Sequence, residues 1–165
     1  MSTENIKDLN LASWHTGSGF SVDKDVLLCA VKDSYRNSGK IYIGTDSHRA
    51  GKNFIFATVI CLHGAVDQQG GNYFFLRRKR KKSMFSSLQQ RLLFETSCSV
   101  EIANYLKDMG VKNIEVHVDC SPKDASHQSG RSADLLRGYV TSCGFGCEIK
   151  PDSWAAHSIA DRHAR

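Results

Sequence analysis

The stretch "IYIGTDSH", residues 41–48, directs the fold prediction because a hydrophobic run ends in an aspartate. The first residues suit a buried strand, whereas aspartate is depleted in strands and rarely buried without a partner. An aspartate at a strand end is often a turn or cap residue, which is one interpretation of Asp46. The other interpretation, a functional carboxylate, requires partners elsewhere in the chain.

Three strand-like segments begin at this stretch: Lys40–His48, Asn53–His63 and Asn72–Arg78. The turn sequences "RAGK" and "DQQGG" separate them, which predicts an antiparallel meander. Before the meander, helical spacing of apolar residues predicts a helix over Val22–Asn37, preceded by the breaker "HTGSG".

Helices and strands alternate after the meander. We expect a helix from about Phe85 to Met109, a strand over Asn113–Cys120, a helix over Ser132–Ser142, a short strand at "CEIK" and a closing helix over Trp154–Arg165. Right-handed crossovers can lay the last two strands parallel to the first. The predicted fold class is therefore α/β: a mixed five-stranded sheet flanked by helices, with the first three strands antiparallel, the fourth and fifth parallel to the first, and an extra N-terminal helix.

Length and composition favour one domain, with residues 1–39 as an N-terminal extension and helix and residues 40–165 as the core. Hydrophobic residues make up 41% and charged residues 24%, as in ordinary globular proteins. No stretch approaches the ~20 apolar residues of a membrane helix, and the polar N-terminus is unlike a signal peptide. We therefore expect a cytoplasmic protein without a membrane partner, in which the six cysteines are mostly small buried hydrophobes.

The net charge of +5 is concentrated in one place. The other 16 basic residues do not exceed the 17 acidic ones, so the excess lies in "RRKRKK", which consists of Arg77, Arg78, Lys79, Arg80, Lys81 and Lys82. We call this segment the basic run. It is a solvated loop, a targeting signal, or an edge that binds the phosphates of nucleic acid. If the strand continues through it, alternate residues share a face, and we expect Arg78, Arg80 and Lys82 to hold phosphates together.

Two further carboxylates have suggestive places. Asp119 follows the alternating apolar residues of the fourth strand, so Asp46 and Asp119 both lie near carboxyl ends of predicted parallel strands, where α/β proteins bind ligands. Glu95 lies on an apolar helical stripe whose other members are Leu88, Leu92, Ser99, Ile102 and Leu106. A glutamate there requires compensation of its charge, which Arg91 could supply, whereas Glu101 is off the stripe and is predicted to be solvated.

The fourth acid is Asp161 in "HSIADRHAR", with His157 about one turn before it. Asp161 and Arg165 could form an ordinary i,i+4 ion pair. Taken together, however, four acids on separate elements are typical of a site for Mg²⁺ or Mn²⁺, which prefer oxygen ligands. Two such ions ~4 Å apart can activate water and stabilise the leaving oxygen at a phosphodiester.

The order of the elements and these acids resemble the ribonuclease H-like superfamily. The words "IGTDSH", "HVDCS" and "KPDSWAAHSIADRHAR", together with the basic stretch after the third strand, resemble its YkuK-like family from about residue 41 to 165. The resemblance implies that Asp46, Glu95, Asp119 and Asp161 are catalytic metal ligands for two Mg²⁺ or Mn²⁺ ions.

The resemblance leaves several roles open. Asp152 is a rival to Asp161 as the fourth ligand, and His157 is a candidate proton carrier although it lies inside the predicted helix. Ser47 and His48 could orient the site or touch substrate, and Gly44 could allow a neighbouring backbone to approach. The segment "SPKDASHQSGRS" is either a plain mobile loop or a phosphate contact made by His127, Ser129 and Arg131.

We therefore predict a metal-dependent nuclease that hydrolyses RNA, RNA–DNA hybrid or DNA. A nucleic-acid-binding module that has lost turnover is the alternative, and a protein-interaction role with a surface acidic cluster is a third. The sequence does not choose among these substrates or indicate an oligomeric state.

Overall fold

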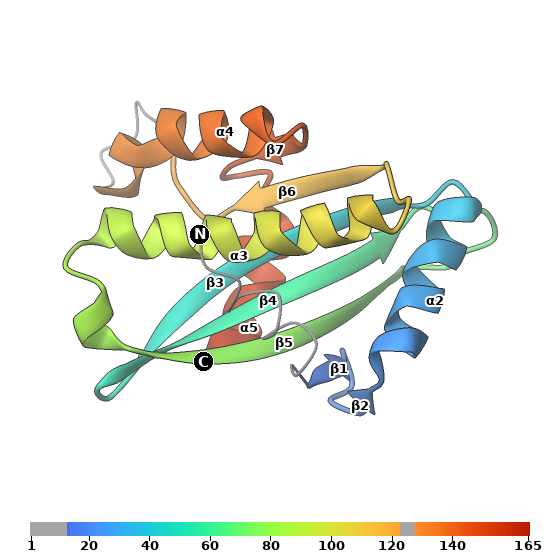
Figure 1. Ribbon diagram of the computed structural model, residues 1–165, viewed down its shortest axis with the longest axis horizontal. Coiled ribbons are helices and arrows are strands. Elements are labelled where there is room, and N and C mark those ends of the chain that lie inside the picture. Colours follow the sequence, from blue (N-terminus) through green and yellow to red (C-terminus); the bar gives the residue numbers. More distant parts are fainter. Residues whose placement is uncertain (1–12, 123–127) are drawn as a thin grey trace.

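The computed structural model describes residues 13–122 and 128–165 as a mixed sheet with helices on both faces (Figure 1). In the first half of the chain the elements are β1 (Trp14–Thr16), β2 (Ser21–Val22), α2 (Lys24–Arg36), β3 (Lys40–Ala50), β4 (Asn53–His63), β5 (Gly71–Lys81) and the 3₁₀ turn η1 (Lys82–Met84). The second half contains α3 (Leu88–Asp108), β6 (Ile114–Val118), the 3₁₀ turn η2 (Gln128–Ser132), α4 (Ala133–Ser142), β7 (Gly146–Glu148), the π-helical η3 (Ala155–Ala160) and α5 (Asp161–Ala164).

The strand directions confirm the predicted topology. Among the described residues the strand order is β2-β1-β5-β4-β3-β6-β7. β3, β4 and β5 form the antiparallel meander, while β6 is parallel to β3 and β7 is parallel to β6. The carboxyl ends of β3 and β6 therefore lie at the same side of the sheet, as required for their aspartates to meet.

The predicted number of five strands is wrong, because β1 and β2 add two strands beyond β5. β1 pairs with β5 through His15 opposite Phe75 and Thr16 opposite Phe74. With three and two residues, these strands are too short to show a period of two, and the sequence around "HTGSG" therefore resembles irregular chain.

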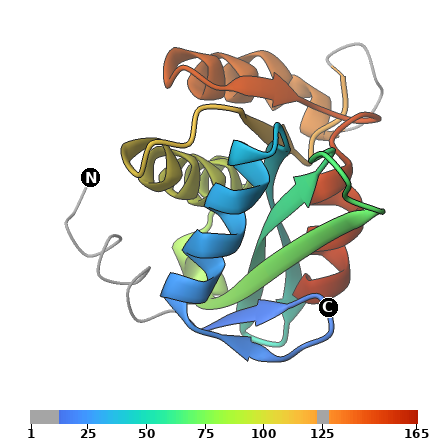
Figure 2. The same ribbon diagram turned by 90° about the vertical axis from the view of Figure 1, so that its right-hand side faces the viewer.

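Strand alternation divides the core between the two faces of the sheet. Ile41 and Ile43 of β3 point toward α3, where α2, α3 and α4 cover the larger core. Tyr42 and the other even-numbered residues of β3 point to the opposite face. There, η3 and α5 cover a smaller core that includes Val59 of β4, Phe75 of β5 and Ala160. Figure 2 shows the sheet between these two helical layers.

Helix α3 forms where apolar spacing predicts it, but it begins three residues later than expected, at Leu88. Ser87 provides the N-cap by accepting a hydrogen bond from Gln90 N, and Gly110 follows the helix with a φ of 91°. The closing helix, predicted over Trp154–Arg165, is π-helical over its first six residues. None of the helices in the described ranges has the length and apolar character of a membrane span.

Candidate functional site

The end of β3 sends consecutive polar side chains to opposite faces of the sheet. Asp46 points toward the C-terminal helix and is buried, with 9% of its surface exposed, and its Oδ1 accepts a hydrogen bond from Ser47 N at 2.7 Å. Ser47 points toward α3, where its hydroxyl donates to Glu95 Oε1 at 2.6 Å. The strand thus connects two carboxyls that belong to different layers.

Glu95 lies inside the apolar stripe of α3, as its position in the sequence predicts, and only 3% of it is exposed. Its Oε1 also lies 3.8 Å from Arg91 Nε, so the predicted ion pair is present but long. Ser99, the other polar member of the stripe, shares a 2.7 Å hydrogen bond with Thr45. Both polar residues of the stripe therefore contact the end of β3.

Burial and like charge act together on these carboxyls. Burial, then the charge of Asp119, and to a smaller extent Asp161 through its charge and as a hydrogen-bond partner, together raise the pKa of Asp46 from 3.8 to about 7. Burial and then the charge of Asp46 raise the pKa of Glu95 well above its usual value. We call Asp46, Glu95, Asp119 and Asp161 the acidic cluster.

Asp119 follows β6, and the ammonium of Lys150 lies 2.6 Å from its Oδ1. This oxygen is buried, and the Lys150 ammonium is its charged partner. The two groups form a close ion pair. A cation bound at Asp119 would compete with Lys150.

The C-terminal helix brings Asp161, rather than its rival Asp152, to Asp46. Asp152 is exposed in the turn before the helix. Asp161 also forms the i,i+4 pair with Arg165, with Nη2 and Oδ2 2.9 Å apart. His157 turns away: its Nε2 lies 3.1 Å from the Pro151 carbonyl and its Nδ1 2.9 Å from Ser158 Oγ.

Gly44 explains how the helix comes so close, and the expected approach of a backbone is confirmed. A Cβ at Gly44 would lie 2.5 Å from Ala156 N and 2.7 Å from the Ala155 carbonyl carbon. Only glycine permits this contact between β3 and η3. Gly44 lies two residues before Asp46, so β3 both positions the C-terminal helix and carries the carboxylate.

His117 is a site residue that the sequence analysis missed. Its buried Nδ1 accepts a hydrogen bond from Ala155 N at 3.0 Å, and its Nε2 donates to Glu115 at 3.1 Å. Glu115 is in turn bound by Lys40 at 2.6 Å. This network anchors the start of the C-terminal helix, and a histidine within the alternating strand "IEVHV" was the available signal.

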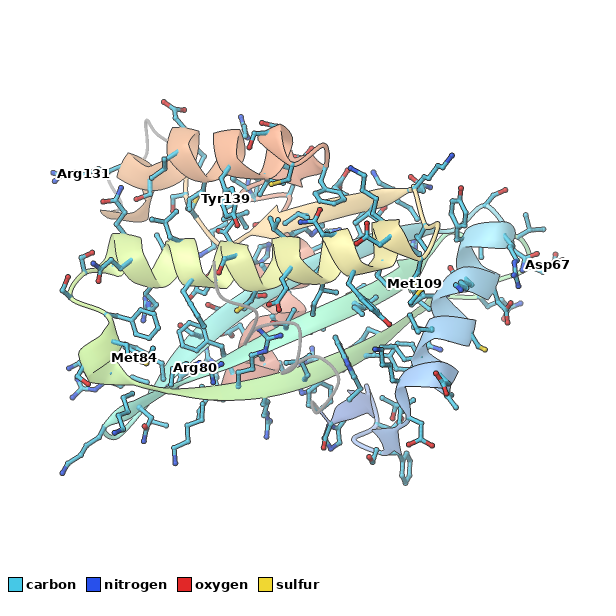
Figure 3. The ribbon with its side chains drawn as sticks, viewed as in Figure 1. Asp67, Arg80, Met84, Met109, Arg131 and Tyr139 are labelled. Atoms are coloured by element: carbon cyan, nitrogen blue, oxygen red, sulfur yellow. The ribbon has the colours of Figure 1, made fainter. Side chains whose placement is uncertain are left out.

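The basic run continues β5 to Lys81, so its side chains alternate. Arg78 and Arg80 share a face, as predicted, but that face is covered by α3. Arg78 is buried and pairs with Glu101 at 3.1 Å, which corrects the prediction that Glu101 is solvated. Arg80 projects from β5 toward α3, 5.9 Å above the ring of Phe94 (Figure 3).

The other half of the basic run lies on the face of Asp46. Asp46 is opposite Ala57, which is opposite Arg77, so Arg77 lies in line with Asp46 across the sheet. Lys79 and Lys81 continue this face and are exposed. Exposed His48 lies in line with Lys79 in the same way.

A hollow of about 750 Å³ at the β3–β4 hairpin gathers more basic residues. Arg49 and Lys52 line it together with Lys81 and Lys82, although the first two are 25 or more residues earlier in the sequence. Arg49 and Lys52 could not be recognised from the sequence, because hairpin pairing and not sequence proximity brings them to the basic run.

The loop candidates are separate from this arrangement. Arg131 is exposed in η2 on the α4 side of the molecule (Figure 3). His127 lies outside the described residues, and the structure does not describe the Ser129 side chain.

The acidic cluster offers the oxygen ligands that Mg²⁺ and Mn²⁺ prefer, and two of its members, Asp46 and Glu95, are buried. Within the described ranges, however, no three His, Cys, Asp or Glu side chains are close enough together to hold a metal. The four acids are thus near enough to perturb ionisation without converging on one point.

A family model described as "Ribonuclease H-like" matches residues 24–165, a range that includes the whole acidic cluster. The chain is also similar to a protein of Bacillus subtilis (strain 168) named "Uncharacterized protein YkuK". The two are 29% identical over 154 residues, which cover 82% of this chain and 84% of the relative. No solved structure gives a significant match.

Proposed function

The chain belongs to the ribonuclease H-like family, and we propose that it hydrolyses phosphodiester bonds of RNA, RNA–DNA hybrid or DNA with the help of Mg²⁺ or Mn²⁺. The observation that carries this proposal is the meeting of Asp46 and Glu95 through Ser47 at the end of β3, beside Asp119. Burying like charges together is unfavourable unless a cation compensates them.

Asp46, Glu95, Asp119 and Asp161 would supply one or two carboxylates to each of two ions, and substrate phosphate would complete the ligand set. When bound, such ions activate water and stabilise the leaving oxygen of a phosphodiester. The protein contributes position: Ser47 fixes Glu95 by a 2.6 Å hydrogen bond, and the contact at Gly44 fixes the helix of Asp161. Lys150 keeps part of the negative charge compensated before the ions arrive.

The nucleic-acid backbone would lie on the face of Asp46, along Arg77, Lys79 and Lys81 and toward the hairpin hollow. Clustered exposed cations bind phosphates through release of condensed counterions. We leave Arg78 out of this surface because it is buried in its pair with Glu101.

A catalytically silent nucleic-acid-binding module is the second candidate. It is favoured by three ion pairs, of Lys150 with Asp119, Arg165 with Asp161 and Arg91 with Glu95, which engage three of the four acids within the protein itself. This module would bind nucleic acid equally well with and without divalent metal.

A cleavage screen tests the proposal: RNA, RNA–DNA hybrid, single-stranded DNA and branched DNA, each with Mg²⁺, Mn²⁺ or EDTA. We expect cleavage of at least one substrate with metal and none in EDTA. Asp46→Asn and Asp119→Asn should each lower the rate at least ~100-fold, the scale on which loss of one charged catalytic group acts. Asp33→Asn, an exposed position on α2, is the matched control. Binding without turnover under every condition would establish the silent module instead.

A further inference from the structure

A second hollow, of about 670 Å³, opens on the same face of the sheet beside the last helical turn. Its walls are the glycine-rich turn at residues 17–19, the rings of His15, Phe75 and His163, and the guanidinium of Arg77. The described residues that line it include no acidic side chain. The hollow therefore presents hydrogen-bond donors, flat rings and positive charge.

The planar groups around the hollow are held in a fixed arrangement. His163 stacks on Phe75 with ring centroids 3.8 Å apart and 12° between the planes, and His15 lies beside Phe75 at 5.3 Å and 23°. Tyr73 shares a 3.1 Å hydrogen bond with His163 Nε2. Arg77 Nε donates to the His163 carbonyl at 2.6 Å. Stacked rings that are already ordered lose little conformational freedom on binding another flat group.

The hollow is adjacent to the acidic cluster in the architecture. Asp46 and Arg77 are in line two strands apart, which is ~10 Å at the usual strand spacing. The last helical turn supplies Asp161 to the acidic cluster and His163 to the hollow. A stacked nucleic-acid strand covers ~10 Å in about three nucleotides.

We propose that this hollow is a nucleotide subsite, which binds one nucleotide of the strand whose phosphodiester lies at the acidic cluster. The phosphate is held by Arg77 and Ser18, and the base lies against the imidazoles of His15 and His163. This inference rests on the proposed function for the identity of the strand, but the binding chemistry of the hollow is independent of turnover.

Calorimetric titration in EDTA tests the chemistry, using adenosine 5′-monophosphate, inorganic phosphate and adenosine as probes. We expect the monophosphate to bind at least 10-fold more tightly than either part alone. Arg77→Ala and His163→Ala should each weaken it about 5- to 100-fold, the range of one stacking contact. His163→Phe should retain most of the affinity because it keeps the stack on Phe75, and the exposed Arg36→Ala should change nothing. Equal binding by all of these proteins would overturn the subsite.

A second arm distinguishes a free nucleotide from a strand, by titrating an oligonucleotide into the Asp46→Asn background in EDTA. If His163→Ala weakens the oligonucleotide as it weakens the monophosphate, the hollow serves the strand. If only the monophosphate responds, the assignment to the substrate strand is wrong. Intact nucleotide binding without cleavage of any substrate would leave the subsite standing and remove the proposed nuclease. Metal-dependent cleavage that is unaffected by His163→Ala, in a protein that does not bind the mononucleotide, would remove the subsite and leave the proposed nuclease.

Discussion

The acidic cluster and the basic run occupy the same sheet but are assembled in opposite ways. The four acids come from four elements and are drawn together by the fold, so that burial and mutual repulsion raise the pKa of Asp46. The six basic residues come from consecutive positions, and the alternation of β5 separates the first five onto two faces, while Lys82 begins η1. Proximity in sequence therefore suggests a single basic site where the fold makes two surfaces. It gives no sign of the acidic cluster, whose members are far apart in the chain.

The largest expected effect concerns the two faces of the basic run. Arg78→Ala should destabilise the protein by about 3–5 kcal/mol, because it opens a gap beneath α3 and removes the ion pair of Glu101. Lys79→Ala, one residue along and exposed, should change stability by less than ~0.5 kcal/mol. Urea unfolding of both variants measures the difference, and similar midpoints would mean that the two faces are not distinct.

The pH dependence of stability tests whether Asp46 is buried among like charges. Its folded pKa of about 7 lies above the ordinary 3.8, so the folded protein holds an extra proton between these values. Metal-free stability should therefore fall as pH rises from about 4 to about 7, by up to ~4 kcal/mol. Asp46→Asn should remove this loss and be the more stable protein at pH 8 without metal. A pH profile of Asp46→Asn identical to that of the unmodified chain would contradict the burial of this charge.

Helix α3 contacts both regions, because its Glu95 belongs to the acidic cluster and its Glu101 pairs with Arg78 of the basic run. Glu95→Gln should lower metal-dependent cleavage ~100-fold, because Glu95 belongs to the acidic cluster, with little loss of stability. Glu101→Gln should instead lower stability through Arg78 and leave the rate per folded molecule unchanged. Steady-state rates combined with thermal melts separate the two. If Glu95→Gln cleaves at the normal rate and Glu101→Gln is inactive, then Glu101 and not Glu95 belongs to the catalytic site.

The smallest expected effect is that of the exposed half of the basic run. Lys79→Ala with Lys81→Ala should weaken binding of all nucleic-acid sequences alike, by about 10-fold at low salt. The slope of log affinity against log salt should fall by ~1.5, since each lost phosphate contact removes 0.7–0.9. A double variant of the exposed Arg36 and Lys112 is the control for net charge. An unchanged slope would exclude this face as the phosphate contact.

The meander, the parallel crossovers and the stripe of α3 could be predicted from sequence because each rests on a long periodic segment. β1 and β2 could not, since their pairing with β5 comes from tertiary contact and not from local pattern. The π-helical geometry of η3 was also not visible, because its apolar residues fit an ordinary helix.

At the candidate site, the placement of Glu95 followed from the sequence because a single acid interrupted an apolar stripe. Two assignments did not follow. Alternation identified which basic residues share a face, but which face α3 covers depends on packing, so Arg78 was assigned to phosphate although it is buried against Glu101. Arg49, Lys52 and His117 were missed because their partners are distant in sequence.

The absence of a side chain at Gly44 sets the distance between the carboxyls of Asp46 and Asp161. Asp46 and Asp161 repel each other when both are ionised, so their own charges cannot set their separation. The distance is set instead by bare backbone against bare backbone, where even a methyl group would stand 2.5 Å from Ala156 N. A single added carbon atom at Gly44 would push η3 away from β3 and so change the distance between Asp46 and Asp161, although it would contact neither residue.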